Sequence, residues 1–209
     1  MKQTRHLLIA LALGTMLTSC GASVSTATVT GPTAYVDPYI GSGGHGHVFV
    51  GASVPFGAIQ AGPQNIHKGW DWCSGYHHSD SIVIGFAHTH LSGTGCTDMG
   101  DVQIMPYTGE LRSKRGRQED IGGSCSSYYS HDNESVSPGY YSLKMDNGVR
   151  IEMTASTRTA LHRITYPEAE GRRLLINLEE GNGDGAYDTY LRQTDAHTVE
   201  GYRFSKGWG

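Results

Sequence analysis

Residues 140–155 read YYSLKMDNGVRIEMTA, and this stretch decides the fold class. Apolar and polar side chains alternate on both sides of the central Asp-Asn-Gly, which is the pattern of half-buried strands. An Asn-Gly pair between two alternating runs is the strongest short-range signal for a β-hairpin, because both residues tolerate positive φ angles. The sequence therefore predicts an antiparallel hairpin with its turn at Asp146–Gly148.

Short runs of alternating or β-branched residues recur along the rest of the chain, with turn residues between them. They lie at residues 82–86, 102–106, 159–166, 172–178 and 197–204. The chain has 29 glycines in 209 residues, close to double the usual fraction, which indicates many turns. No amphipathic helix of normal length and no internal repeat is evident. These patterns predict an all-β chain folded as an antiparallel β-sandwich.

The N-terminus has the features of an export signal. Lys2 and Arg5 precede an apolar segment, residues 7–17, which is too short to span a bilayer. The segment ends in Leu-Thr-Ser-Cys, the pattern of a bacterial lipobox, and this pattern predicts cleavage before Cys20 and lipidation of its thiol. We expect a lipid-anchored protein of the cell envelope, at the outer membrane and facing the periplasm or the surface, with the anchor as its only membrane contact.

This interpretation divides the chain into three parts. Residues 1–20 are the lipoprotein signal peptide, and residues 21–34, which are small and uncharged, are a flexible tether. Residues 35–209 are one β-sandwich domain, long enough to bury a core. The chain stops at Gly209 shortly after entering a strand, so we expect this domain to be truncated at its C-terminal end.

Charge and cysteine content exclude some functions. The net charge is −4 and the basic residues form no stripe, which argues against nucleic acid as a partner. Three cysteines follow the lipobox, and an odd number in an exported protein leaves at least one free thiol. A bridge between Cys96 and Cys125 is one option, whereas Cys73, between Trp72 and Ser74, is expected to stay reduced and buried.

Residues 41–51 contain five glycines in eleven positions around His45 and His47. Such glycines let the backbone approach a ligand closely or adopt positive φ angles. The stretch lacks the Lys-Ser/Thr ending of a phosphate-binding loop. Either it holds backbone N–H groups and His47 at the rim of a pocket, or it is only a tortuous structural loop, and the sequence leaves both open.

Residues 68–80, KGWDWCSGYHHSD, place two tryptophans and a tyrosine within seven positions among polar neighbours. Core aromatics normally sit among aliphatic residues. A sugar ring stacks its C–H face on Trp or Tyr, while nearby Asp, His and Ser bond its hydroxyls. We expect at least one ligand-facing aromatic here, and the alternative is one core tryptophan in an ordinary loop.

Residues 85–101, GFAHTHLSGTGCTDMGD, carry His88 and His90 at the spacing that puts two strand side chains on one face. Two histidines with Asp101 would suit zinc or iron. The same residues would also suit the wall of a sugar pocket or a structural hydrogen-bond network. The sequence alone does not decide among these three interpretations.

Three stretches together resemble glycoside hydrolase family 92, the calcium-dependent exo-acting α-mannosidases. They are DPYIGSGGHGHVFVGASVPFGAIQAGP (37–63), WDWCSGYHHSD (70–80) and IGFAHTHLSGTGCTDMGDVQIMP (84–106). The resemblance implies an N-terminal β-sandwich packed on a larger (α/α)₆ barrel, and inverting hydrolysis of terminal α-mannosides, α-1,2 by default. It also implies that the catalytic carboxylates and most ligands of Ca²⁺ lie in the barrel. No catalytic residue or metal ligand is therefore assigned within this chain.

The resemblance implies a substrate-binding role for part of these stretches, with mannose-containing glycans and the chain's own barrel domain as partners. Trp70, Trp72 and Tyr76 would offer a stacking surface, and a Trp72→Ala change would raise KM or lower kcat. His88 and His90 would order a pocket wall, Asp101 would fix the turn, and His47 with its glycines would line the opposite rim. The full set is Gly44, Gly46, His47, Trp70, Trp72, Cys73, Ser74, Tyr76, His88, His90 and Asp101.

Two departures from the family pattern concern substrate preference. The chain has His-Val-Phe-Val-Gly at residues 47–51, where a His-Thr-Phe-Pro-Gly-like segment is expected, and His78 where a tyrosine is expected. Two other functions remain as alternatives. One is a non-catalytic carbohydrate-binding module, and the other is a metal-dependent hydrolase that uses His88, His90 and Asp101.

Overall fold

The computed structural model describes residues 31–114 and 124–207. The expected signal peptide, the lipidation site Cys20 and most of the tether lie outside the described residues. The first described element is an exposed 3₁₀ turn, η1 (Pro32–Tyr35), at the end of the expected tether. Within the described ranges, no helix has the length and apolar character needed to cross a membrane.

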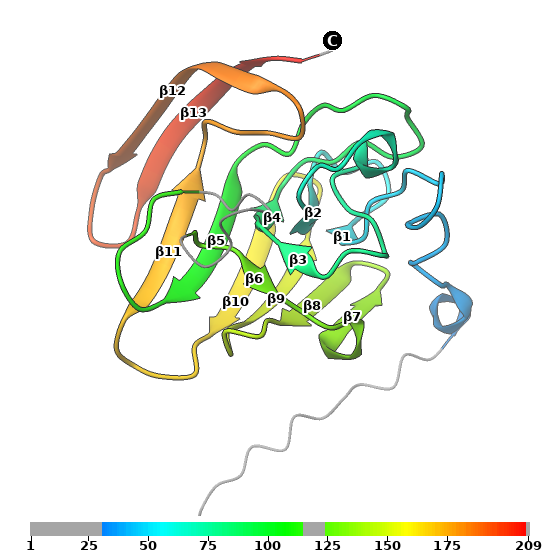
Figure 1. The fold of residues 1–209 in the computed structure, drawn as a ribbon, viewed down its shortest axis with the longest axis horizontal. Coiled ribbons are helices and arrows are strands. Elements are labelled where there is room, and N and C mark those ends of the chain that lie inside the picture. The colour runs from blue at the N-terminus through cyan, green and yellow to red at the C-terminus, as the bar shows by residue number, and fades with distance from the viewer. Residues whose placement is uncertain (1–30, 115–123, 208–209) are drawn as a thin grey trace, which may run out of the picture.

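The described part is built from antiparallel strands, which confirms the all-β prediction (Figure 1). One sheet has the order β1-β2-β4-β5-β11 and a second has the order β10-β9-β8-β7, with β12-β13 and β3-β6 as two-stranded ribbons. Helical segments are the short 3₁₀ turns η1, η2 (Trp70–Trp72) and η4 (His131–Asn133). The strands are β1 Ala52–Ser53, β2 Gln60–Gln64, β3 Ile82–Val83, β4 Gly85–Ala87, β5 Gln103–Thr108, β6 Ser127–Tyr128, β7 Glu134–Ser137, β8 Tyr140–Lys144, β9 Arg150–Ala155, β10 Ala160–Thr165, β11 Arg172–Asn177, β12 Gly185–Gln193 and β13 Val199–Lys206.

The predicted hairpin forms at residues 140–155. Strands β8 and β9 pair antiparallel with Leu143 opposite Ile151, and both side chains are buried. The turn closes with a hydrogen bond from the backbone N–H of Met145 to the carbonyl of Val149, 2.9 Å long. Gly148 adopts a φ of 85°, the conformation that makes glycine the favoured residue there.

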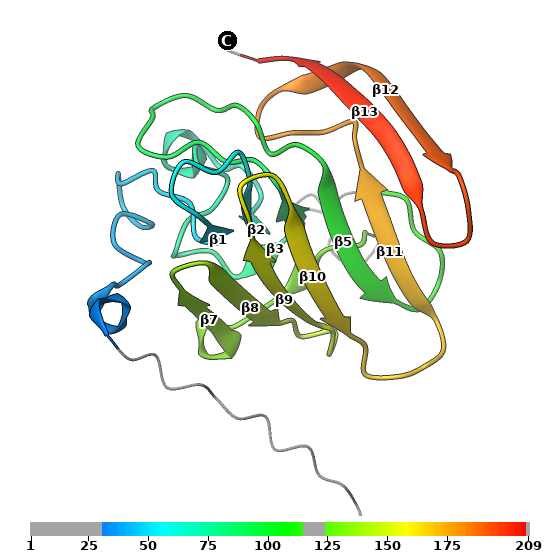
Figure 2. The same ribbon diagram turned by 180° about the vertical axis from the view of Figure 1, so that it is seen from behind.

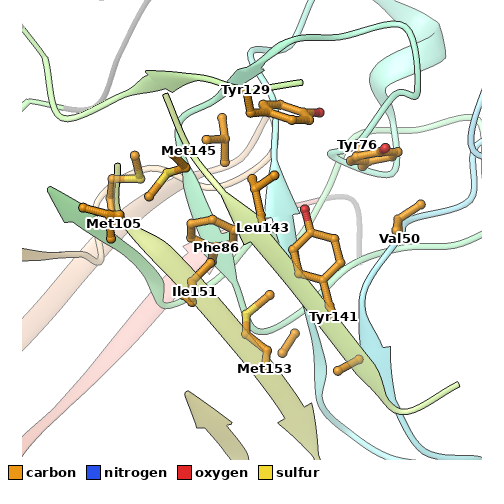
Figure 3. Close-up of a cluster of buried hydrophobic side chains, with 14 of the residues drawn as sticks. Val50, Tyr76, Phe86, Met105, Tyr129, Tyr141, Leu143, Met145, Ile151 and Met153 are labelled. Carbon is orange, nitrogen blue, oxygen red and sulfur yellow. The ribbon is translucent and has the colours of Figure 1, made fainter. Parts of the chain in front are cut away.

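The core lies between the two larger sheets, which pack face to face as a sandwich (Figures 1 and 2). Phe86 of β4 contributes from one sheet, and Tyr141, Leu143, Ile151 and Met153 contribute from the other (Figure 3). All five are at most 1 % exposed, so their burial supplies the main driving force for the fold.

The structure differs from the sequence prediction at residues 82–86, and it shows which of the cysteines are free. Residues 82–86 form two short strands, because β3 pairs with β6 whereas β4 pairs with β2 and β5. Cys73, Cys96 and Cys125 are all free, so the Cys96–Cys125 option is not realised. Cys73 is buried, as predicted.

Candidate functional site

The glycine-rich loop is a tight structure whose shape depends on Gly46. Its backbone closes with a hydrogen bond from the N–H of Val48 to the carbonyl of Gly41, 3.0 Å long. A Cβ atom at Gly46 would lie 2.1 Å from that carbonyl oxygen. The loop turns His47 inward with a positive φ of 54°, which strains a non-glycine residue. Gly44 is exposed, and a side chain there would meet open space.

Replacing Gly46 by alanine should therefore open the loop. The methyl group collides with backbone, which cannot rotate away as a side chain can, so we expect a loss of about 2–3 kcal/mol of unfolding free energy. Urea denaturation would measure it. Gly185→Ala is the matched control, because its added Cβ meets nothing within 4 Å. Equal stability of the two variants would contradict the close packing of the loop.

The loop brings two histidines to Trp70 and Asp71. His45 Nδ1 lies 2.6 Å from Asp71 Oδ1, and His47 Nε2 lies 3.5 Å from the same oxygen. The rings of His47 and Trp70 form a T-shaped pair, with 4.2 Å between their centroids and 89° between their planes. The Trp70 indole donates to the carbonyl of Gly95 at 2.9 Å. His47 and Trp70 are thus in contact on one wall, and the prediction of opposite rims was wrong.

This cluster combines an open aromatic face with a charged acceptor. Trp70 is 57 % exposed, although large aromatics usually bury their rings. The hydrogen bond with His45 holds the pKa of Asp71 below its ordinary value, so the carboxylate stays ionised. A stacking surface beside an ionised carboxylate and two imidazoles is an arrangement that binds a sugar ring and its hydroxyls.

Trp72 is held from several sides by neighbouring side chains. Its ring stacks on His77 at 4.4 Å, and its indole donates to Asp80 Oδ2 at 3.0 Å. Lys68 pairs with the same carboxylate at 2.9 Å and lies over the Trp72 ring. Trp72 is half-buried, so the Trp72→Ala change would disturb this scaffold as well as a ligand.

Three expected contact residues are buried instead. Tyr76 is 1 % exposed, and its hydroxyl donates to Glu134 in the core, so its ring offers no stacking surface. Cys73 and Ser74 are each 1 % exposed and bond backbone carbonyls, those of Trp70 and Tyr76. The sequence interpretation failed here because the chain enters the interior directly after Trp72, and all of residues 73–77 are buried.

The side chains of His88, His90 and Asp101 do not converge on one point, although the backbone N–H of His88 bonds the carbonyl of Asp101 at 3.1 Å. His88 Nε2 lies 2.9 Å from Nε2 of His162 on β10. His90 Nδ1 instead lies 2.8 Å from the carbonyl of Gln60, and its ring stacks on Phe49. The two imidazoles diverge because β4 ends at Ala87, so the alternation of a strand does not continue through them. The geometry does not support a metal-dependent hydrolase built on these three residues.

Burial of His90 makes the stability of the domain depend on pH. Desolvation lowers its pKa from 6.5 to about 4, so the folded state keeps the ring neutral where the unfolded state protonates it. The unfolded state then binds more protons, and stability falls as pH falls from about 6.5 to about 4. A His90→Asn variant should show a flatter stability profile over this window in urea titrations. His197→Asn, at an exposed turn, should keep the wild-type slope; equal slopes for the two variants would contradict the assignment.

A polar network ties the Trp70–Cys73 turn to the far end of the chain. The Asn182 side-chain amide donates to the carbonyl of Cys73 at 2.6 Å. Asp101 accepts from Thr89 at 2.8 Å and pairs with Arg203, which also pairs with Asp184. Asn182 and Arg203 were not predicted as site residues, and His45 and Asp71 were noted only as members of their stretches, because nothing local marks residues that meet across long separations.

Residues 35–209 match the model of the glycosyl hydrolase family 92 N-terminal domain. The chain belongs to glycosyl hydrolase family 92. This membership confirms the resemblance drawn from the three motif stretches, and it agrees with the observed β-sandwich.

Solved family 92 structures share the fold. The α-mannosidase BT3965 from Bacteroides thetaiotaomicron, solved in complex with mannoimidazole, is 40 % identical with a TM-score of 0.81, over 85 % of this chain and 23 % of its own. The inverting mannosidase BT2199 from the same organism is 26 % identical with a TM-score of 0.65, over 84 % of this chain and 23 % of its own.

A curated relative is also a glycosidase by name. The uncharacterized secreted glycosidase of Arthroderma benhamiae is 32 % identical over 158 residues, which cover 71 % of this chain and 18 % of that protein. This family 92 chain therefore spans about a quarter or less of the length of the relatives it matches.

Proposed function

We propose that the protein carrying this family 92 domain is a glycosidase that removes terminal α-linked mannose from glycans, with α-1,2 linkages as the preferred substrate. The observation that carries the proposal is the open face of Trp70 beside the ionised Asp71, within a domain of this family. The α-mannosidase neighbour, at 40 % identity, supports mannose as the sugar.

The described residues supply binding rather than bond cleavage. Inversion needs two carboxyl groups roughly 6.5–9.5 Å apart, one to donate a proton and one to activate water. The cluster at Trp70 offers one carboxylate, Asp71, which is already engaged by His45. We therefore assign stacking of the sugar ring to Trp70 and hydroxyl contacts to Asp71 and His45, and we expect the acid and base in another part of the protein.

We include Ca²⁺ in the proposal because the chain belongs to family 92, and not because the described residues offer a set of calcium ligands. Ca²⁺ requires six to eight oxygen ligands. Around the described site the carboxylates already have basic partners, because Asp80 pairs with Lys68 and Asp184 pairs with Arg203. We assign no calcium-dependent catalytic step to the residues of this domain.

The location is proposed from the N-terminus. A lipidated Cys20 would hold the enzyme in the bacterial envelope, where it would meet glycans outside the cytoplasm. The secreted glycosidase relative is consistent with an exported enzyme. Incorporation of labelled palmitate into the wild type but not into a Cys20→Ala variant would test the anchor.

The activity is tested with the protein at its natural length. We expect it to release mannose from α-1,2-mannobiose, with β-mannose as the first anomer seen by NMR, and to lose activity in EDTA until calcium is restored. The α-1,3 and α-1,6 isomers test the linkage. Glycan binding without release would favour the carbohydrate-binding module, and α-mannose as the first product would refute inversion.

A further inference from the structure

We propose that His78, His131 and Glu134 form a binding site for a zinc ion, separate from the sugar site and independent of the proposed function. One potential ligand atom from each residue lies within 4.8 Å of the others. His131 and Glu134 are close in the chain, in the short η4 and at the first position of β7, whereas His78 comes from a distant segment, the turn after η2. The fold therefore assembles the cluster.

Glu134 is the fixed centre of the cluster. Its side chain is fully buried. Oε1 accepts from the Tyr141 hydroxyl at 2.7 Å, and Oε2 accepts from the Tyr76 hydroxyl at 3.0 Å. His131 Nδ1 lies 2.7 Å from Oε2. These contacts hold the carboxylate in one orientation, as the outer hydrogen bonds of a metal ligand do.

The charge of this buried carboxylate has little compensation. The contacts of Glu134 in the described residues are neutral tyrosine hydroxyls and one imidazole, without lysine or arginine. Burying a carboxylate is costly unless it is paired or coordinates a metal. A divalent cation bound by the carboxylate would provide that compensation.

Two imidazoles approach the carboxylate from the open side. His78 stacks on His131 at 4.2 Å between ring centroids, with 29° between the ring planes. His78 is exposed, so solvent and a metal ion have access. His131 also has a buried Nε2 atom without a hydrogen-bond partner. His78 Nδ1 lies 3.4 Å from the Tyr76 hydroxyl, so the pair offers one unused nitrogen on His131 and one with only a long contact on His78.

The ligand set favours zinc over harder cations. Two imidazoles and one carboxylate suit Zn²⁺, with bonds of about 2.0–2.2 Å and water as the fourth ligand. Calcium and magnesium prefer oxygen ligands throughout. Ligand atoms around a tetrahedral zinc lie roughly 3.4 Å apart, by geometry from these bond lengths. The observed group would need only small side-chain shifts to reach that spacing.

The zinc site is separate from the sugar site because the adjacent residues His77 and His78 pack against different partners. His77 stacks on Trp72, whereas the next residue, His78, stacks on His131. The backbone N–H of His78 also bonds the carbonyl of Ser42 in the glycine-rich loop, 2.8 Å away. Zinc would therefore fasten the loop, the aromatic turn and β7 together without entering the sugar-binding wall.

The experiment is a zinc titration of the protein at its natural length. The protein is treated with EDTA, desalted and titrated with ZnCl₂ in excess calcium, which saturates any calcium site. We expect one zinc per chain and a higher melting temperature with zinc. His78→Phe keeps the aromatic stack but removes a ligand, and it should weaken zinc binding at least about 100-fold. His197→Phe makes the same change at an exposed turn and should bind zinc like the wild type.

Two outcomes would overturn the site: no zinc uptake by the wild type, or equal affinity in His78→Phe. A His131→Gln variant repeats the test if His78→Phe does not fold. Co²⁺ gives a second readout, because tetrahedral Co²⁺ absorbs visible light strongly and this absorption should vanish in the His78 variant. Absorption that persists there would place the metal elsewhere and refute the proposal.

Discussion

Replacing Arg203 by alanine is expected to lower the free energy of unfolding by about 3–5 kcal/mol, the cost of breaking a buried ion pair on one side. The Arg203 side chain is 2 % exposed and pairs with Asp101 and with Asp184, the latter at 3.0 Å. Its Nε also donates to the carbonyl of Leu178 at 2.8 Å. Alanine would leave the Asp184 carboxylate, whose side chain is 1 % exposed, buried without a cation.

Thermal and urea unfolding would measure the loss, with a shift of the melting temperature of about 10 °C for a domain of this size. The chain contains a matched control in Arg192→Ala. Arg192 pairs with Glu200 on the same ribbon, but both side chains are more than half exposed, at 59 % and 52 %. Such surface pairs contribute about 0–1 kcal/mol. Similar losses in both variants would show that Arg203 does not hold a buried network.

The secondary structure was predictable wherever it depends on neighbouring residues. The hairpin at 140–155 follows from alternation and an Asn-Gly turn, and both signals act over a few positions. Residues 172–178 were predicted as a strand for the same reason, and β11 covers most of them. In contrast, β7 begins at Glu134, a charged residue that no strand pattern marks, because its burial depends on tyrosines from other segments.

The candidate site was predictable as a region but not residue by residue. The exposed Trp70 lies where the aromatic motif placed a ligand-facing ring. Tyr76, six residues later, has the same chemistry but points into the core, because Glu134, 58 positions away, accepts its hydroxyl. Arg203 and Asp101 are 102 positions apart, and no local pattern joins them. Family resemblance supplied what residue patterns could not, namely that these motifs belong together.

Replacing Trp70 by alanine is expected to lower kcat/KM of the protein at its natural length by about 10- to 100-fold on a terminal α-mannoside, equivalent to about 1.4–2.8 kcal/mol. The ring is 57 % exposed and flanked by His45 and His47, so a sugar stacked on it would lose its largest apolar contact in this domain. Stability should change little, because the exposed face packs against no core residue and the indole makes a single hydrogen bond, to Gly95.

This separation of activity from stability distinguishes Trp70 from its neighbour. Trp72 is stacked on His77 and bonded to Asp80, so Trp72→Ala should lower both kcat/KM and the melting temperature. Trp70→Phe retains a ring and should recover most of the activity, whereas Phe56→Ala removes an exposed aromatic in the turn between β1 and β2 and should change nothing. Steady-state kinetics and thermal unfolding on the four variants would decide. If Trp70→Ala keeps the wild-type kcat/KM, the sugar does not bind on the open indole face. That result would refute the sugar site proposed for this domain.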